Sequence, residues 1–121
     1  MANFASTDVT VTLVRSNILR GSPGGLRFNN VKIQFGDGAL TYAAGGVPVP
    51  GPTAFGLLKR LDAILLYQNG VATIGYVWSY DPANNKLKGM EEVAAASSTA
   101  LAEIAAGAIA AQTLYGYAIG W

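Results

Sequence analysis

The sequence predicts an all-β fold, a sandwich or small barrel, built as a single domain over residues 1–121. Apolar and polar residues alternate in several short stretches, which is the period of a half-buried strand. Turn signals rich in Gly, Pro, Asn and Asp separate these stretches about every 8 to 12 residues. A chain of 121 residues has room for one hydrophobic core, and a second one is not expected.

The first strand is predicted over residues 8–16, DVTVTLVRS. Val9, Val11 and Leu13 alternate with threonines, and β-branched residues favour strands. The stretch RGSPGG at 20–25 then predicts a turn, because Gly and Pro adopt the backbone angles that turns need.

A β-hairpin is predicted over the stretch NNVKIQFGDGALTYAA. Val31, Ile33 and Phe35 alternate with polar residues, as in a strand. The sequence GDG at 36–38 suits a tight hairpin loop because Gly and Asp tolerate positive φ angles, and residues 39–42 would form the return strand.

The stretch TYAAGGVPVPGPT at 41–53 is rich in Gly and Pro. Its prolines fix φ at alternate positions and donate no N–H there, so residues 47–51 are expected to run extended in a polyproline-like path. A preorganised segment loses little entropy on docking, and we therefore expect a strut that contacts a partner subunit. The candidate contacts are Val47, Pro48, Val49, Pro50 and Phe55.

Two further strands are predicted within residues 61–80, joined by the hairpin dipeptide NG at 69–70. The bulkier face of the second strand, which includes Trp78, is expected to point into the core. The turn-rich stretch DPANNKLKG follows at 81–89, with 86–88 as a short edge strand whose lysines discourage edge-to-edge pairing.

The last third of the chain contains an Ala-rich segment, residues 91–112, whose structure the pattern leaves uncertain. We expect a strand or loop over 90–96, then short or irregular elements. Alternation in TLYGYAIGW predicts a final strand over 113–119.

Composition excludes several classes of function. Charged residues make up only 12% of the chain, and the net charge is +1. The eight Lys and Arg residues are scattered, so a nucleic-acid partner is not expected. We found neither a long apolar run nor a signal peptide, which predicts no membrane association and synthesis in a cytosol. Without His or Cys, most catalytic and metal chemistry lacks its usual groups, and no cofactor or enzymatic activity is expected.

Few residues remain as candidates for chemistry. A hydrolase would need Asp62 to converge with Glu91 or Glu92, although Asp62 reads more simply as the polar start of a strand. Asp81, Asn84 and Asn85 have oxygens at a spacing compatible with Ca²⁺, but a solvated turn explains them better because further carboxylates are missing. Asp37 is likewise explained by turn geometry.

Aromatic residues form two stripes at strand spacing, Tyr76, Trp78 and Tyr80 in the first and Tyr115, Tyr117 and Trp121 in the second. Burial in a core or an interface is the favoured explanation. The alternative is a lectin-like carbohydrate-binding module that stacks sugar on Tyr76, Trp78 or Tyr115, and exposure of the rings discriminates between the two.

Three stretches in this order resemble one known group: GALTYAAGGVPVP at 38–50, YDPANNKLKG at 80–89 and LAEIAAGAIAAQTLYGYAIGW at 101–121. Together they are similar to the small head decoration, or cement, proteins of tailed bacteriophages. The resemblance covers about two thirds of the chain, and its motifs are turn and core patterns. The final Trp121 and the long Ala-rich lead-in depart from the group.

The resemblance implies a β-sandwich or jelly-roll-like homotrimer on the outer capsid surface of a virion, made in the bacterial host cytoplasm. Its partner would be the major capsid protein of the same phage, whose neighbouring subunits it clamps together. We expect residues 1–8 to form an extended N-terminal arm that reaches a neighbour, with Ala2, Asn3 and Phe4 as further candidate contacts.

Overall fold

A computed structural model of the protein describes residues 3–18, 26–69, 76–92, 101–104 and 107–121. Two short 3-10 helices occur in these ranges, η1 (Ser6–Asp8) and η2 (Pro52–Phe55). The strands are β1 (Thr10–Ile18), β2 (Arg27–Phe35), β3 (Thr41–Tyr42), β4 (Val47–Pro48), β5 (Leu61–Asn69), β6 (Tyr76–Asp81), β7 (Lys86–Glu92), β8 (Leu101–Glu103), β9 (Gly107–Ala108) and β10 (Gln112–Gly120).

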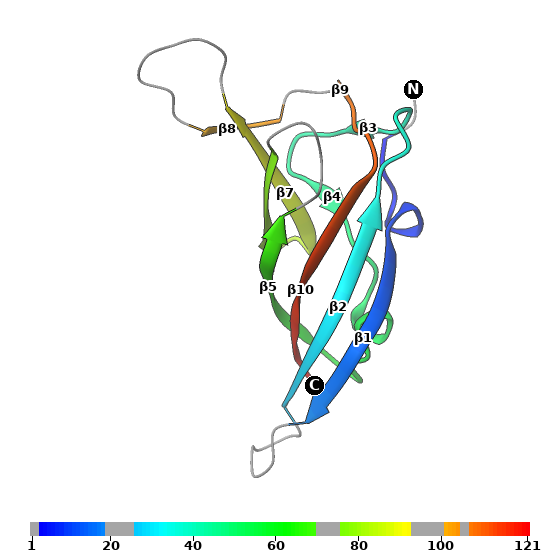
Figure 1. Cartoon of the computed structure of the whole chain (residues 1–121), viewed down its shortest axis with the longest axis vertical. Helices are drawn as coiled ribbons and strands as arrows, with labels where there is room; N and C mark the ends of the chain where they lie inside the picture. Colours follow the sequence, from blue (N-terminus) through cyan, green and yellow to red (C-terminus); the bar gives the residue numbers. More distant parts are fainter. Residues whose placement is uncertain (1–2, 19–25, 70–75, 93–100, 105–106) are drawn as a thin grey trace.

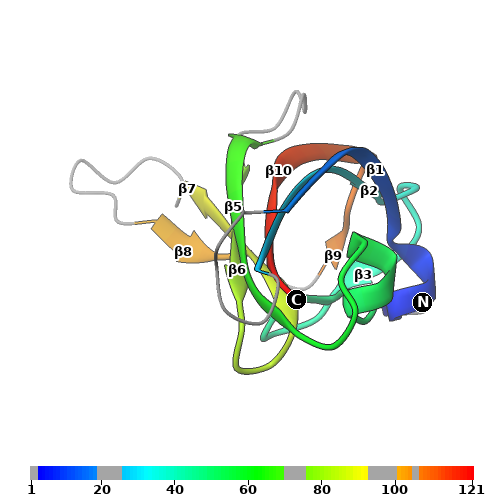
Figure 2. The same ribbon diagram turned by 90° about the horizontal axis from the view of Figure 1, so that it is seen from below.

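The strands form antiparallel sheets, which confirms the predicted all-β, sandwich-like class (Figure 1). The first sheet has the order β1-β2-β10-β5. In the second sheet β7 is central, with β6 along one edge and both β4 and β8 along the other. A short β3-β9 pair makes a third sheet. Figure 2 shows the first sheet curved around the interior, with β6 beside β5.

Strict alternation places the core on one face of the first sheet. Every second residue of β10 is buried, from Gln112 to Gly120, and Leu114 and Ala118 are completely enclosed. On β2, Val31 and Ile33 are completely enclosed in the same way. The pattern singled out this face on β2, whereas on β10 the tyrosines Tyr115 and Tyr117, whose burial was favoured, lie on the opposite face, because a strand sends successive side chains to opposite sides.

Phe35 and Trp78 join the two main sheets at the centre of the core. Their rings meet edge to face with centroids 4.9 Å apart. Phe4 packs against Phe35 in the same manner at 5.9 Å. The prediction that the bulky face of the strand around Trp78 points inward is confirmed, since Trp78 is 2% exposed and Val77 is 44% exposed.

The predicted hairpin across residues 36–38 is wrong. Gly36 and Gly38 do adopt positive φ, as expected, but β3 pairs with β9 and the described partners of β2 are β1 and β10. A turn signal specifies the local backbone and leaves the pairing open. The carbonyl of Ala110 takes the space where a Cβ on Gly36 would lie, so the chain from β9 crosses directly over this glycine.

The position of residues 86–88 in their sheet also differs from prediction. Residues 86–88 belong to β7, which is paired along both edges, and so they do not form an edge strand. The described ladder of β5 is with β10, and that of β6 is with β7. The turns predicted just after Asn69 and at 20–25 lie outside the described residues. In the last third, β8, β9 and β10 confirm the predicted short elements and the final strand.

A buried tyrosine hydroxyl connects three segments distant in sequence. The hydroxyl of Tyr42 donates to Glu103 Oε2 at 2.9 Å and accepts from the backbone N–H of Gly89 at 3.2 Å. The backbone N–H of Gly45 also donates to Glu103 Oε2, at 3.1 Å. Burial is the largest cause that raises the pKa of Tyr42 to about 12, and Glu103 adds to it. The hydroxyl therefore stays protonated and keeps its role as donor.

Tyr42→Phe is expected to lower the free energy of unfolding by about 1–3 kcal/mol, because the Gly89 N–H and the Glu103 carboxylate lose a partner in a buried setting. Urea unfolding at neutral pH measures the change. Tyr117→Phe is the matched control, since Tyr117 is exposed, and it should change stability by less than about 0.5 kcal/mol. Equal effects of the two substitutions would show that the Tyr42 hydroxyl contributes nothing.

Candidate functional site

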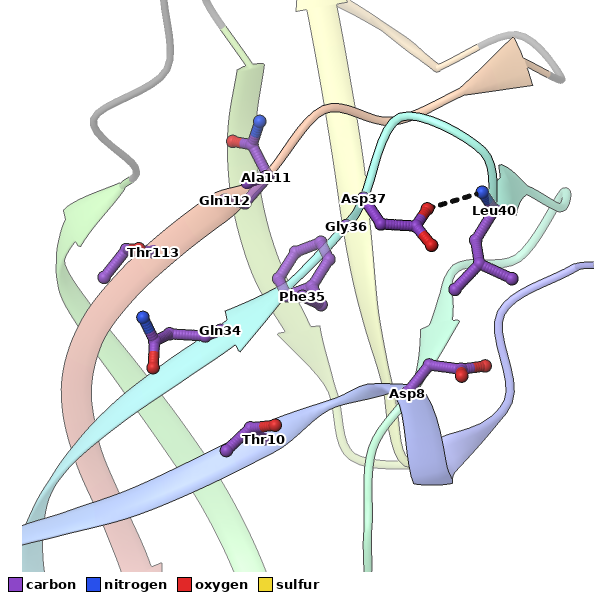
Figure 3. A pocket seen from close by; sticks show the side chains of 10 residues that line it. All are labelled: Asp8, Thr10, Gln34, Phe35, Gly36, Asp37, Leu40, Ala111, Gln112 and Thr113. Carbon is purple, nitrogen blue, oxygen red and sulfur yellow. Dashed lines mark hydrogen bonds between the residues drawn. The ribbon is translucent and has the colours of Figure 1, made fainter.

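A pocket of about 420 Å³ lies at one end of the first sheet, where β2 leads into the loop before β3 and β10 begins. Figure 3 shows Gln34 and Thr113 on neighbouring strands at one side of it, and Asp8, Asp37 and Leu40 at the other. Among the described residues that line it, two are carboxylates and none is Lys or Arg. The pocket is therefore polar and acidic, and its size is in the range of small-ligand sites.

Asp37 is held in place by its own loop. Its Oδ1 accepts hydrogen bonds from the backbone N–H groups of Leu40 at 2.9 Å and Ala39 at 2.8 Å. These bonds, that from Leu40 first, hold the pKa of the Asp37 carboxyl below its ordinary value. The predicted turn role of Asp37 is confirmed. Asp8 is fixed similarly, because its Oδ2 accepts the N–H of Ala5 at 2.8 Å.

The outer face of the same sheet carries a group of aromatic rings, Tyr67, Tyr115 and Tyr117, called here the tyrosine face. The ring of Tyr67 lies 5.5 Å from that of Tyr117 and 6.4 Å from that of Tyr115, centroid to centroid. Tyr67 is 55% exposed and Tyr117 is 37% exposed, while Tyr115 is half-buried. The Tyr67 hydroxyl donates to Asn30 Oδ1 at 3.1 Å, so its ring is anchored to β2.

Three further exposed apolar side chains, called here the edge patch, are Leu13 and Val14 on β1 and Leu58 in the loop after η2. These side chains are 40%, 56% and 69% exposed. Leu13 lies against the turn after η2, since a Cβ built on Gly56 would come within 2.6 Å of Leu13 Cδ1. β1 is the outermost strand of its sheet, and its described ladder is with β2 alone.

The predicted contact residues of the strut face inward. Val47, Val49 and Phe55 are 0%, 3% and 0% exposed, so the expectation that they meet a partner subunit is wrong. The segment does run extended, but it docks on its own chain, because β4 pairs with β7. Pro48 and Pro50 are half-buried along this contact.

Asn85 holds the strut in place. Its Nδ2 donates to the carbonyl of Val49 at 3.0 Å, and its Oδ1 accepts from the hydroxyl of Tyr80 at 2.6 Å. The side-chain oxygens of Asp81 accept from the backbone of Ala83 and the amide of Asn84. These groups serve the turn between β6 and β7, as the turn interpretation of this stretch predicted.

The expected N-terminal arm is also corrected from Asn3 onward. Phe4 is 7% exposed, and its N–H donates to the carbonyl of Thr41 at 3.3 Å. Thr41 further donates its hydroxyl to Asn3 Oδ1 at 2.6 Å. These residues pack on the body of the protein because Phe4 completes the aromatic core. Ala2 lies outside the described residues.

The structure describes the side chains of two carboxylates of the hydrolase alternative, Asp62 and Glu91, and they stand on strands of different sheets. Asp62 on β5 pairs with Arg60 at 2.6 Å. Glu91 is on β7, in the second sheet. The side chain of Glu92 lies outside the described part.

Of the rings named for sugar stacking, Trp78 is excluded by its burial, and its indole N–H points to Gln112 Oε1 at 3.4 Å inside the core. Tyr115 reaches the outer face, and the side chain of Tyr76 lies outside the described part. The sequence interpretation missed Tyr67 and Leu58. Tyr67 lies in a predicted strand, so the alternation of that strand could have identified it. Nothing in the sequence pattern marks the loop residue Leu58 as exposed.

In the described part of the chain, no helix is long and apolar enough to cross a membrane. Comparison with protein-family models, curated proteins and solved structures gave no match.

The Asp37 carboxyl is expected to titrate below pH 3.8, its ordinary value, because the loop amides favour its charged form. The charge therefore stabilises the loop above that pH, and this contribution is lost as the pH falls through the lower folded-state pKa. An NMR titration of the side-chain carboxyl carbon measures the midpoint. Asp37→Asn, the control, should remove the linked pH dependence of the Ala39 and Leu40 amide signals, and a midpoint above 3.8 would contradict the expectation.

Proposed function

We propose that the chain is a structural virion protein, a capsid decoration protein that acts as a homotrimer on the outer surface of a phage head and stabilises contacts between major capsid subunits. The observation that carries the proposal is the edge patch. Soluble monomers seldom leave apolar side chains clustered along an open sheet edge, because such edges associate. In a decoration protein, a neighbouring subunit covers them.

The occupant we assign to the edge patch is a second copy of the chain, as expected for a homotrimer. β1 carries a register shift between Leu13 and Arg15, which interrupts regular strand addition along this edge. Contact through side chains is therefore expected, with the exposed Val14 and Leu58 at its centre. With only 12% charged residues, the chain carries little repulsion between copies.

Decoration by such a protein needs no catalytic group. A protein that binds the assembled shell and not its free subunits shifts the equilibrium toward the intact particle by mass action. Symmetry repeats each contact around the trimer, so modest contacts sum over the shell. The three stretches that resemble decoration proteins support the same function, and they include β4, β7 and β10.

The edge patch is tested by Val14→Asp and Leu58→Asp. Each substitution places a charge at the contact, and we expect the dissociation constant of the trimer to rise at least ~10-fold, which corresponds to about 1.4 kcal/mol. Analytical ultracentrifugation over a concentration series measures the change. Val77→Asp on β6 is the matched control, since Val77 is 44% exposed outside the patch. A wild-type protein that stays monomeric at all concentrations would overturn the trimer.

Capsid binding is tested on the phage that encodes the chain. We expect mass spectrometry to find the protein in purified virions, and particles that lack it to release their DNA at a lower temperature than wild-type particles. Adding the purified protein back should restore heat resistance. Absence from virions together with unchanged particle stability would disprove the function.

A further inference from the structure

We propose that the tyrosine face and the adjoining pocket together bind a neutral oligosaccharide. This activity goes beyond capsid decoration and uses a different surface from the edge patch. The two parts of the site are a row of exposed aromatic rings and a polar cavity at its end. Aromatic faces pack against the apolar C–H faces of sugar rings, and hydroxyl, amide and carboxylate groups bind sugar hydroxyls.

The strand register joins the pocket to the tyrosine face. Thr113 pairs with Gln34, and both line the pocket. The next outward-facing pair along β10 and β2 is Tyr115 with Lys32, and the one after it is Tyr117 with Asn30. Successive pairs on one face of a sheet lie about 7 Å apart. The site is therefore a row of three residue pairs along two neighbouring strands that begins in a cavity, which suits a linear chain of sugar rings.

The rings of this site are preorganised. Tyr115 and Tyr117 stand on β10, which is paired with β2 on one side and β5 on the other. The hydrogen bond from Tyr67 to Asn30 fixes the third ring at 55% exposure. A ligand that stacks on rings already held in place costs little further ordering of side chains.

The area and the charge of the face favour a small neutral ligand over a protein. A large apolar side chain offers on the order of 200 Å² in full, so the exposed parts of Tyr67, Tyr117 and Leu65, the register partner of Tyr117, amount to roughly 300 Å². A stable protein interface takes about 800 Å² from each partner. Strand addition is excluded because β10 is paired on both edges. Asp8 and Asp37 at the pocket and Lys32 beside Tyr115 place charges of both signs along the site, which suits a neutral ligand, and all three can form hydrogen bonds with sugar hydroxyls.

The test is a titration of the ¹⁵N-labelled full chain with maltohexaose, cellohexaose and chitohexaose, followed by amide NMR signals. We expect at least one hexaose to give saturable shifts confined to residues 8–10, 30–40, 65–67 and 111–117. Tyr67→Ala combined with Tyr117→Ala should then weaken the binding of that hexaose at least ~10-fold. Tyr67→Phe combined with Tyr117→Phe should retain most of the affinity, because the rings remain. Gln34→Ala tests the pocket and should weaken binding at least ~3-fold.

Val77→Ala on β6 is the control outside the site and should leave binding unchanged. The proposal is overturned if none of the three hexaoses gives saturable shifts, or if binding survives loss of both rings in a protein that remains folded. It is also overturned if the double alanine variant changes the oligomeric state and no hexaose binds, because the tyrosine face is then a protein interface. Failure of this test leaves the edge patch and the decoration function unaffected, since those are measured by sedimentation and capsid occupancy.

Discussion

The pairing of β7 along both of its edges is the constraint on which the rest of this fold depends. One edge carries β6, and the other carries β4 and β8 in succession, so three strands pair with β7. The close approach of β4 requires Gly46, whose φ is +120° and where a Cβ would lie 2.6 Å from the carbonyl oxygen of Leu87. The Tyr42 hydroxyl then links the backbone of β7 to Glu103 on β8. The stretches at 38–50, 80–89 and 101–121 are held together by these contacts, which gives them a structural role.

Sequence patterns predicted the strands well because alternation is a local property. The inner face of β2 and the inward position of Trp78 follow from period and bulk, whereas on β10 the bulky Tyr115 and Tyr117 lie on the face opposite the core. Pairing partners were predicted less well. A GDG turn specifies positive φ at Gly36 and Gly38 and leaves open whether the chain returns along the same strand or crosses to another, as it does here. That choice depends on contacts between residues far apart in the sequence, and a single sequence does not display them.

For the candidate surfaces too, local features were predictable from the sequence, and contacts between distant segments were not. Tyr115 was identifiable because it alternates within a predicted strand, and the structure adds Tyr67 from β5, which comes alongside only through the β5-β10 ladder. The strut was recognised as extended and rigid, but its apolar side chains were assigned to a partner when they fill the core of their own chain. Proline predicts backbone shape, whereas burial is decided by which strand lies opposite, in this case β7.

The position of β10 has a consequence for how the protein is made. β10 lies between β2 and β5 in the first sheet, yet it is formed by residues 112–120, after every other strand in the chain. During synthesis, β2 and β5 are therefore complete before the strand that separates them exists. The nascent chain must keep two apolar strands apart until then, or let them find β10 afterwards by long-range pairing, which is intrinsically slow. The first sheet closes in a single late step, and the interval before that step is when this chain is most exposed to misassembly.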